Sequence, residues 1–192
     1  MNNSTFMALA LTGGTWVIWA LILSSVGAVA VAYDRWSLFR QEANALAALR
    51  PKFLSALADS DLEGAQKAIK ANPGACARVL GEPENLAAAL SDERRRLEGR
   101  LLWLGTLGNN APFVGLFGTV LGVIKAFHDL AESGAGPEVV MSGLSEALVA
   151  TAVGLLVAIP CVLSFNFLQK RMRDILSETE ALGLRYDASR RR

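Results

Sequence analysis

The sequence predicts an all-α membrane protein with three transmembrane helices, and composition and charge-free windows are the reasons. The 192 residues are 52% hydrophobic and 19% charged, with a mean hydropathy of +0.33, which is too apolar for an ordinary soluble domain. Residues 1–33, 101–124 and 147–169 contain no Asp, Glu, Lys or Arg. Each window is long enough to cross about 30 Å of hydrocarbon as a helix. The net charge of +1 gives no basic footprint for nucleic acid.

The first predicted span, near residues 13–33, has an alternative interpretation as a cleaved signal peptide. Its end, "AVAVAYD" from Ala28 to Asp34, carries small residues spaced as at a peptidase site. A signal peptide begins with a positive region, but no Lys or Arg precedes Trp16. A transmembrane helix is therefore the preferred interpretation. The other two spans are predicted near residues 107–130 and 140–168.

The distribution of basic residues predicts the orientation. Residues 34–100 hold 11 of the 19 Lys and Arg residues, residues 170–192 hold 7, and the remaining one is Lys125. The positive-inside rule then places both basic segments in the cytoplasm, with the N-terminus outside and the C-terminus inside. The predicted organisation is a periplasmic stub with the first span (1–33), a cytoplasmic helical region (34–106), the second span (107–130), a periplasmic loop (131–139), the third span (140–168) and a cytoplasmic tail (169–192).

The cytoplasmic region is predicted to extend the spans with long helices and to contain a helical hairpin. Ala and Leu recur there at helical spacing, and Pro51 and "ANPG" (71–74) are expected to interrupt the helices. Asp61 is expected to cap the helix "LEGAQKAIK". A further helix is predicted to run from Ser91 to Asn109 without a break. Cys76 and Cys161 indicate neither a disulfide nor a metal site, and no cofactor is expected.

Small residues form a narrow stripe on each of the two later spans. The second span carries Gly115, Gly118 and Gly122, with Thr119 at the edge, and the third carries Ala147, Ala150, Gly154 and Ala158, with Thr151 at the edge. Such stripes let membrane helices approach closely. Two faces of this kind in one chain predict a ring of five chains. Periodicity alone leaves the two threonines as packing residues that return a hydrogen bond to the i−4 carbonyl.

The third span also carries a carboxylate, Glu146. A charge at the middle of a membrane helix costs about 2.5–3.5 kcal/mol, so such a residue is expected to face protein or water and to have a use. Glu146 lies about 140° round the helix from Thr151, so the two cannot both point straight into one pore. Lys125 either pairs with Glu146 or extends its long side chain outward to water, and the second interpretation is preferred.

Two long motifs in these spans carry a resemblance to a known family. "APFVGLFGTVLGVIKAF" (111–127) is followed after a short gap by "GLSEALVATAVGLLVAIPCVLSFNF" (143–167). This pair resembles the signature of the MotA/TolQ/ExbB proton channel family, and is most similar to its ExbB/TolQ branch. A weaker resemblance covers "GGTWVIWALILSSVGAVAVAYDRW" (13–36), with an acidic–Arg pair just inside the membrane.

The resemblance implies a homopentamer whose second and third helices surround a pore that holds a dimer of single-span, ExbD- or TolR-like subunits. Proton flow would drive mechanical work on a TonB-like, TolA-like or other envelope partner. By position, Thr119 and Thr151 match the pore threonines and Glu146 the third-helix acid, while Pro112 and Pro160 match prolines linked to conformational change. The proton-carrying Asp is expected on the partner. The process powered stays open between import, envelope maintenance and gliding-type motility.

Two other functions remain as alternatives. The small-residue stripes are also compatible with a noncatalytic membrane scaffold. Ser145, in "GLS" (143–145), and His128, the single histidine, suggest a rhomboid-type intramembrane protease. Three spans are too few for that fold and no segment supplies an oxyanion site, so the protein is not expected to be an enzyme.

Overall fold

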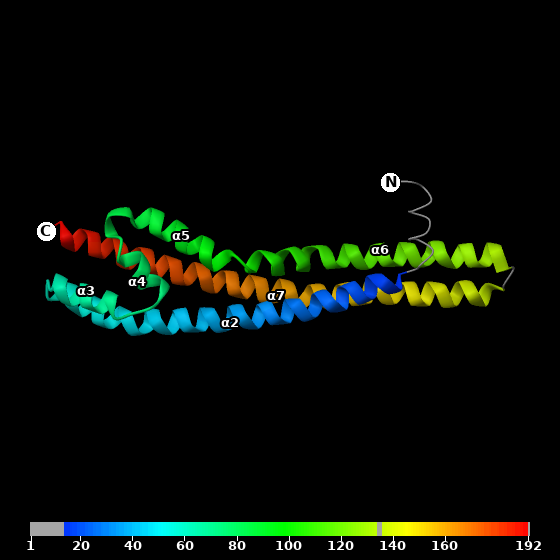
Figure 1. Ribbon diagram of the computed structural model, residues 1–192, viewed down its shortest axis with the longest axis horizontal. Coiled ribbons are helices and arrows are strands. Elements are labelled where there is room, and N and C mark those ends of the chain that lie inside the picture. Colours follow the sequence, from blue (N-terminus) through cyan, green and yellow to red (C-terminus); the bar gives the residue numbers. More distant parts are fainter. Residues whose placement is uncertain (1–13, 134–135, 192) are drawn as a thin grey trace. The chain divides into compact units, whose positions relative to one another are not determined.

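The computed structural model describes residues 14–133 and 136–191, and predictions that fall on residues 1–13, 134–135 and 192 lie outside the described residues. The chain divides into two compact units, a membrane unit (1–32 and 103–164) and a polar unit (33–102 and 165–192). The described residues are helical almost throughout and contain no strand (Figure 1). The elements are α2 (Thr15–Ala58), α3 (Leu62–Lys70), α4 (Ala75–Leu80), the 3₁₀ turn η1 (Pro83–Asn85), α5 (Leu86–Glu98), α6 (Leu101–Ser133) and α7 (Pro137–Arg190).

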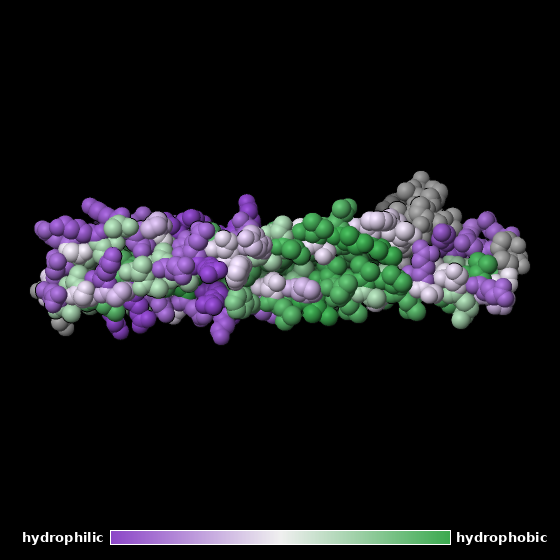
Figure 2. All heavy atoms as spheres, turned by 90° about the horizontal axis from the view of Figure 1, so that it is seen from below, coloured by the Kyte–Doolittle hydropathy of each residue, from purple (hydrophilic) through white to green (hydrophobic). Residues whose placement is uncertain are grey.

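Three of these helices, α2, α6 and α7, are long and apolar enough to cross a membrane. This confirms the predicted fold class, and Figure 2 shows hydrophobic side chains gathered over these helices on the face in view. The predicted loop 131–139 is helical at both ends, because α6 continues to Ser133 and α7 begins at Pro137. Proline fits the first position of a helix, where its missing N–H has no partner to lose.

In the membrane unit, α6 packs against α7 through the two small-residue stripes. A Cβ added to Gly115 would lie 2.7 Å from the carbonyl oxygen of Ala150, and one added to Gly154 would lie 2.7 Å from that of Ala111. The stripes thus contact each other within one chain. The stripes therefore do not by themselves require neighbouring chains, and the ring of five stays a prediction.

The first apolar helix, α2, also contacts this helix pair. Val17 is fully buried, and a Cβ added to Gly118 would lie 3.1 Å from Val17 Cγ1. The outward faces of the unit carry large apolar side chains: Phe113 is 68% exposed, Leu148 65% and Leu156 71%. Within the membrane unit, small residues therefore lie at helix contacts, and large residues are presented to lipid or to other chains.

Local signals in the polar unit gave two correct and two wrong predictions. The segment 71–74 interrupts the helices between α3 and α4, as predicted. Asp61 caps α3, because its Oδ1 accepts from the Gly64 N–H at 2.9 Å, as predicted. Pro51 does not interrupt α2, which continues to Ala58. Proline removes one helical hydrogen bond, but Leu49 and Phe53 on either side are buried, and their packing keeps the helix intact. The predicted unbroken helix from Ser91 is interrupted at residues 99–100, where a glycine weakens the helix between α5 and α6.

An ion network joins three helices of the polar unit. Arg78 on α4 binds Glu93 on α5 through Nη2–Oε1 at 2.6 Å and Nε–Oε2 at 3.1 Å. Its Nη2 also lies 3.0 Å from Glu42 Oε1 on α2, and Glu42 Oε2 accepts from the Ala75 N–H at 2.6 Å. Both glutamates are buried, at 7% exposure. These hydrogen bonds raise the pKa of Arg78, chiefly through Glu93.

Candidate functional site

The structure brings Thr119 on α6 and Thr151 on α7 into direct contact. Their hydroxyl oxygens are 2.5 Å apart, and either can be the donor. Thr119 Oγ1 also approaches the carbonyl oxygens of Gly115 at 3.3 Å and Ala147 at 3.1 Å. The first of these is the i−4 bond common to helical threonines, while the second crosses between the helices. Both residues are half-buried.

The small-residue stripes account for this contact. The two stripes lie in close contact. A Cβ added to Gly115, Gly118 or Gly122 on α6 would lie 2.7–3.1 Å from atoms of Ala147, Ala150 or Gly154 on α7. Each threonine stands at the edge of its stripe, so close approach of the two backbones brings the edges together. A hydroxyl both donates and accepts, which lets the pair take part in a hydrogen-bonded chain without carrying a charge.

Glu146 lies one and a half turns before Thr151 on α7, about 7.5 Å along the helix. Its Oε1 accepts a hydrogen bond from Thr15 Oγ1 at 3.0 Å, and its side chain is exposed. Glu146 and Thr15 line a cavity of about 240 Å³ together with Lys125, Asp129 and Ser142. A carboxylate in an open polar cavity of this kind has access to water, which lowers the cost of its charge.

Lys125 lines the same cavity but does not form an ion pair with Glu146 in the described structure. The structure therefore does not show the ion pair with Glu146 that was one of the two predicted roles of Lys125. Thr15 is a contact that the sequence analysis missed. It lies 131 residues before Glu146, and no local pattern links the two positions.

The two prolines assigned to conformational change lie inside helices. Pro112 is half-buried in α6 and Pro160 is exposed in α7. Neither interrupts its helix, although each removes one backbone donor, so the carbonyls of Gly108 and Leu156 lose their i+4 partner. Both positions combine continuous helix with a locally weaker hydrogen-bond ladder.

The residues considered for a protease are not arranged as a catalytic pair. His128 Nε2 lies 3.6 Å from Glu132 Oε1, and its Nδ1 lies 4.0 Å from Asp129 Oδ1. Ser145 is exposed on α7 and makes no hydrogen bond with His128 in the described part of the chain. Among residues 14–133 and 136–191, His, Cys, Asp and Glu form no cluster that could hold a metal ion.

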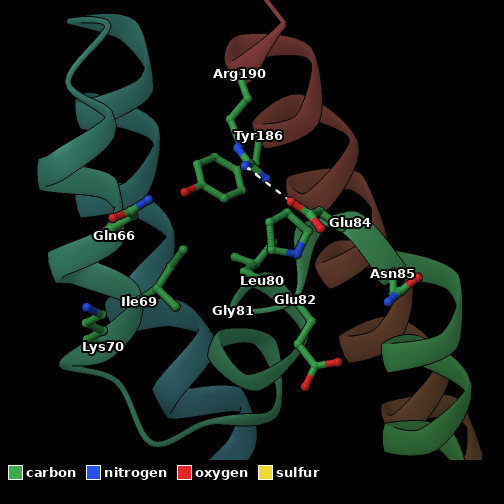
Figure 3. Close-up of a pocket in the computed structure, with 11 residues that line it drawn as sticks. Gln66, Ile69, Lys70, Leu80, Gly81, Glu82, Glu84, Asn85, Tyr186 and Arg190 are labelled. Carbon is green, nitrogen blue, oxygen red and sulfur yellow. Dashed lines mark ion pairs between the residues drawn. The ribbon is translucent and has the colours of Figure 1, made fainter.

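A cavity of about 530 Å³ in the polar unit contains none of the predicted site residues (Figure 3). It lies between α3, the turn after α4 and the C-terminal part of α7. Arg190 there is 3.9 Å from Glu84 and lies over the ring of Tyr186. Its mixed acidic and basic lining, with Glu82, Glu84, Lys70 and Arg190, selects no class of ligand.

Comparison with known proteins places the paired helices in a recognised family. Residues 75–181 match the model of the MotA/TolQ/ExbB proton channel family. The matched range includes all of α6 and the α7 segment that carries Glu146, Thr151 and Pro160.

Individual relatives agree with this match. The chain is 32% identical over 174 residues to the Tol-Pal system protein TolQ of Pseudomonas aeruginosa, covering 78% of this chain and 75% of TolQ. It is 44% identical over 89 residues to the biopolymer transport protein ExbB of Aquifex aeolicus, covering 46% of this chain and 60% of that protein. A similar match to ExbB of Neisseria gonorrhoeae, 41% identical over 90 residues, covers 46% of this chain and 41% of the relative. The chain therefore belongs to the MotA/TolQ/ExbB proton channel family.

Proposed function

We propose that this protein is the channel subunit of a proton-driven motor in the bacterial inner membrane. With a dimer of single-span, ExbD- or TolR-like partners, a homopentamer of the chain converts proton motive force into mechanical work on a TonB-like, TolA-like or other envelope partner. Family membership supports the channel class. The names of the relatives, biopolymer transport and Tol-Pal system proteins, support an energising role rather than catalysis.

The contact between Thr119 and Thr151 is the observation that carries the proposal. Two hydroxyls meet on facing helices in a unit whose surroundings are largely apolar. Such a pair can receive a proton from one neighbour and pass another onward, because each hydroxyl both donates and accepts. We assign it the role of positioning the partner's Asp as that carboxyl group takes up and releases protons.

Glu146 is assigned to the outer end of the same path. Its exposed carboxylate lines a polar cavity, where it attracts protons or holds a neighbouring subunit. The hydrogen bond from Thr15 fixes the carboxylate relative to α2. One elementary charge that crosses the membrane is worth about 2.3 kcal/mol per 100 mV, so a blocked relay removes the energy input. Pro112 and Pro160 are assigned to the bending that follows each proton transfer.

The experiment measures proton flux into vesicles that contain the chain and an ExbD- or TolR-like single-span partner. Thr119→Val and Thr151→Val preserve shape and delete a hydroxyl, while Glu146→Gln preserves shape and deletes a charge. We expect all three variants to insert, to assemble with the partner, and to lose proton flux. Thr106→Val is the matched control, because Thr106 lies on α6 about 140° round the helix from Thr119 and should leave flux unchanged.

Three outcomes decide the proposal. If Thr151→Val and Glu146→Gln keep full flux at normal expression, the threonines are packing residues and the proton-path assignment fails. If the wild-type complex assembles but conducts no protons, the protein is a scaffold. Native mass spectrometry of the purified complex tests the pentamer separately, and a monomer or closed dimer would contradict it.

A further inference from the structure

A second polar cavity, of about 250 Å³, lies between α2 and the C-terminal part of α7 in the polar unit. Arg40 on α2 and Arg171 on α7 supply its charged groups, and Asn44 adds an amide. Trp36 and Phe167 form aromatic walls. The described residues that line the cavity include no acid, so the cavity is positively charged.

Each arginine is held against an aromatic ring. Arg40 Cζ lies 5.6 Å from the centre of the Trp36 ring, and Arg171 Cζ lies 5.4 Å from that of Phe167. Stacking of this kind orients a guanidinium while leaving its N–H donors available. Within residues 14–133 and 136–191, neither arginine forms an ion pair with an acid. The cavity thus presents two oriented cations whose charge no protein group balances.

The cavity also follows directly on the apolar part of both helices. Arg40 is seven residues beyond Tyr33, the last residue of the charge-free window, which is about 10 Å along the helix. Arg171 is two residues beyond the window that ends at Gln169. The lipid headgroup layer extends about 5–8 Å beyond the hydrocarbon on each side, and a long arginine side chain can reach back into it. Trp36 and Phe167 are 46% and 50% exposed, as is typical of side chains at this level.

We propose that this cavity binds the phosphate group of an anionic phospholipid. The guanidinium groups of Arg40 and Arg171 donate to phosphate oxygens, for which their planar fork is well suited. The acyl chains lie along the exposed faces of Trp36 and Phe167. Basic pockets at the cytoplasmic ends of membrane helices favour lipid headgroups for the same electrostatic reason. The exposed aromatic walls favour a lipid over a free phosphate ion, which would leave them in water.

The test measures binding of phosphatidylglycerol to the full-length protein in detergent by native mass spectrometry, with phosphatidylcholine of the same acyl chains as the neutral reference. The matched control for Arg40→Gln/Arg171→Gln is Arg50→Gln/Arg173→Gln, which removes the same charge from the same two helices outside the cavity. A basic residue near a lipid surface contributes about 1 kcal/mol, so we expect roughly fivefold weaker phosphatidylglycerol binding for each single variant and roughly thirtyfold for the double. The control should bind as the wild type does, and phosphatidylcholine binding should not change.

Equal losses in the test and control double variants would show general charge attraction and overturn the proposal. Should the double variant fail to fold, the same question is answered by quenching of Trp36 fluorescence with brominated lipids, taken as the part of the quenching that Trp36→Phe removes. Stronger quenching by brominated phosphatidylglycerol than by brominated phosphatidylcholine supports the site, and equal quenching refutes it. Displacement of the lipid by millimolar inorganic phosphate or by an acidic peptide would assign the cavity to that ligand and overturn the lipid assignment.

Discussion

Replacing Arg78 by Met should destabilise the polar unit strongly, because it leaves buried Glu42 without a counter-ion and buried Glu93 with only the longer contact to Arg96, at 3.4 Å. Glu42 and Glu93 are each 7% exposed, and Arg78 bonds both. Removing one partner of a fully buried ion pair costs about 3–5 kcal/mol. The Arg78 side chain is 35% exposed, so water screens part of the interaction. We therefore expect the free energy of unfolding of the polar unit to fall by about 2–3 kcal/mol.

The structure supplies the assay for this loss. Cys76 is 2% exposed, so a thiol-reactive dye labels it only when the polar unit opens. In a Cys161→Ala background, the temperature at which Cys76 becomes reactive reports the unfolding of this unit. A domain of about this size loses roughly 4–8 °C per kcal/mol, so Arg78→Met should lower the midpoint by roughly 10–20 °C.

A triple variant separates charge pairing from packing. Glu42→Gln/Arg78→Met/Glu93→Gln removes the whole charge network, and the amide oxygen introduced at position 42 can still accept from the Ala75 N–H. This variant should be more stable than Arg78→Met alone, because no uncompensated charge stays buried. A midpoint for Arg78→Met within about 3 °C of the wild type, which is below the shift that one kcal/mol produces, would refute the reasoning. If the triple variant is no more stable than Arg78→Met, the packing of the Arg78 side chain, and not its charge, stabilises the polar unit.

Three further predictions concern packing, thiol chemistry and orientation. Gly115→Ala should destabilise the membrane unit by about 1–3 kcal/mol, because its Cβ would lie 2.7 Å from a backbone oxygen, while Gly136→Ala, with nothing within 4 Å, should be neutral in thermal unfolding in detergent. Burial raises the pKa of Cys76 to about 11, so the thiol stays protonated below that pH, and iodoacetamide at about pH 8, near the ordinary thiol pKa, should label the unfolded chain but not the folded one. A cysteine at Ala58 should be protected from an impermeant external thiol reagent in intact cells, whereas one at Gly136 should react; the reverse pattern would invert the proposed topology.

The sequence predicted best the features that depend on one helix at a time. The capping role of Asp61 depends on four consecutive residues, and the apolar windows depend on composition, so both could be recognised locally. Pro51 was misjudged because contacts made elsewhere outweigh the helical hydrogen bond that it removes. Buried neighbours keep α2 helical through Pro51, whereas the break between α5 and α6 falls at Gly99, a local helix-weakening residue to which the sequence analysis gave no weight.

Contacts between helices were accessible only in part. Periodicity placed Thr119 and Thr151 at the edges of their stripes, but their contact depends on the register between α6 and α7, which periodicity does not fix. The hydrogen bond from Thr15 to Glu146 joins positions 131 residues apart. The bonds of Arg78 to Glu42 and Glu93 join positions 36 and 15 residues apart. Without a pattern that links distant positions, such pairs emerge only from the folded chain.

The geometry around Thr119 gives its hydroxyl pair a direction. Thr119 has a single proton and lies near two carbonyl oxygens, which can only accept. If Thr119 donated to Thr151, neither carbonyl contact would carry a proton. If Thr151 donates to Thr119, then Thr119 can donate to one of the two carbonyls, so this arrangement makes one more hydrogen bond. The free side of Thr151 then offers lone pairs alone. A neutral carboxylic acid or a water molecule can donate to it, but an ionised carboxylate is met by an acceptor until the Thr151 hydroxyl rotates about its C–O bond. In the proposed proton path, we therefore expect the pair to distinguish the two protonation states of the partner's acid, and a single bond rotation, without backbone movement, to reverse that preference.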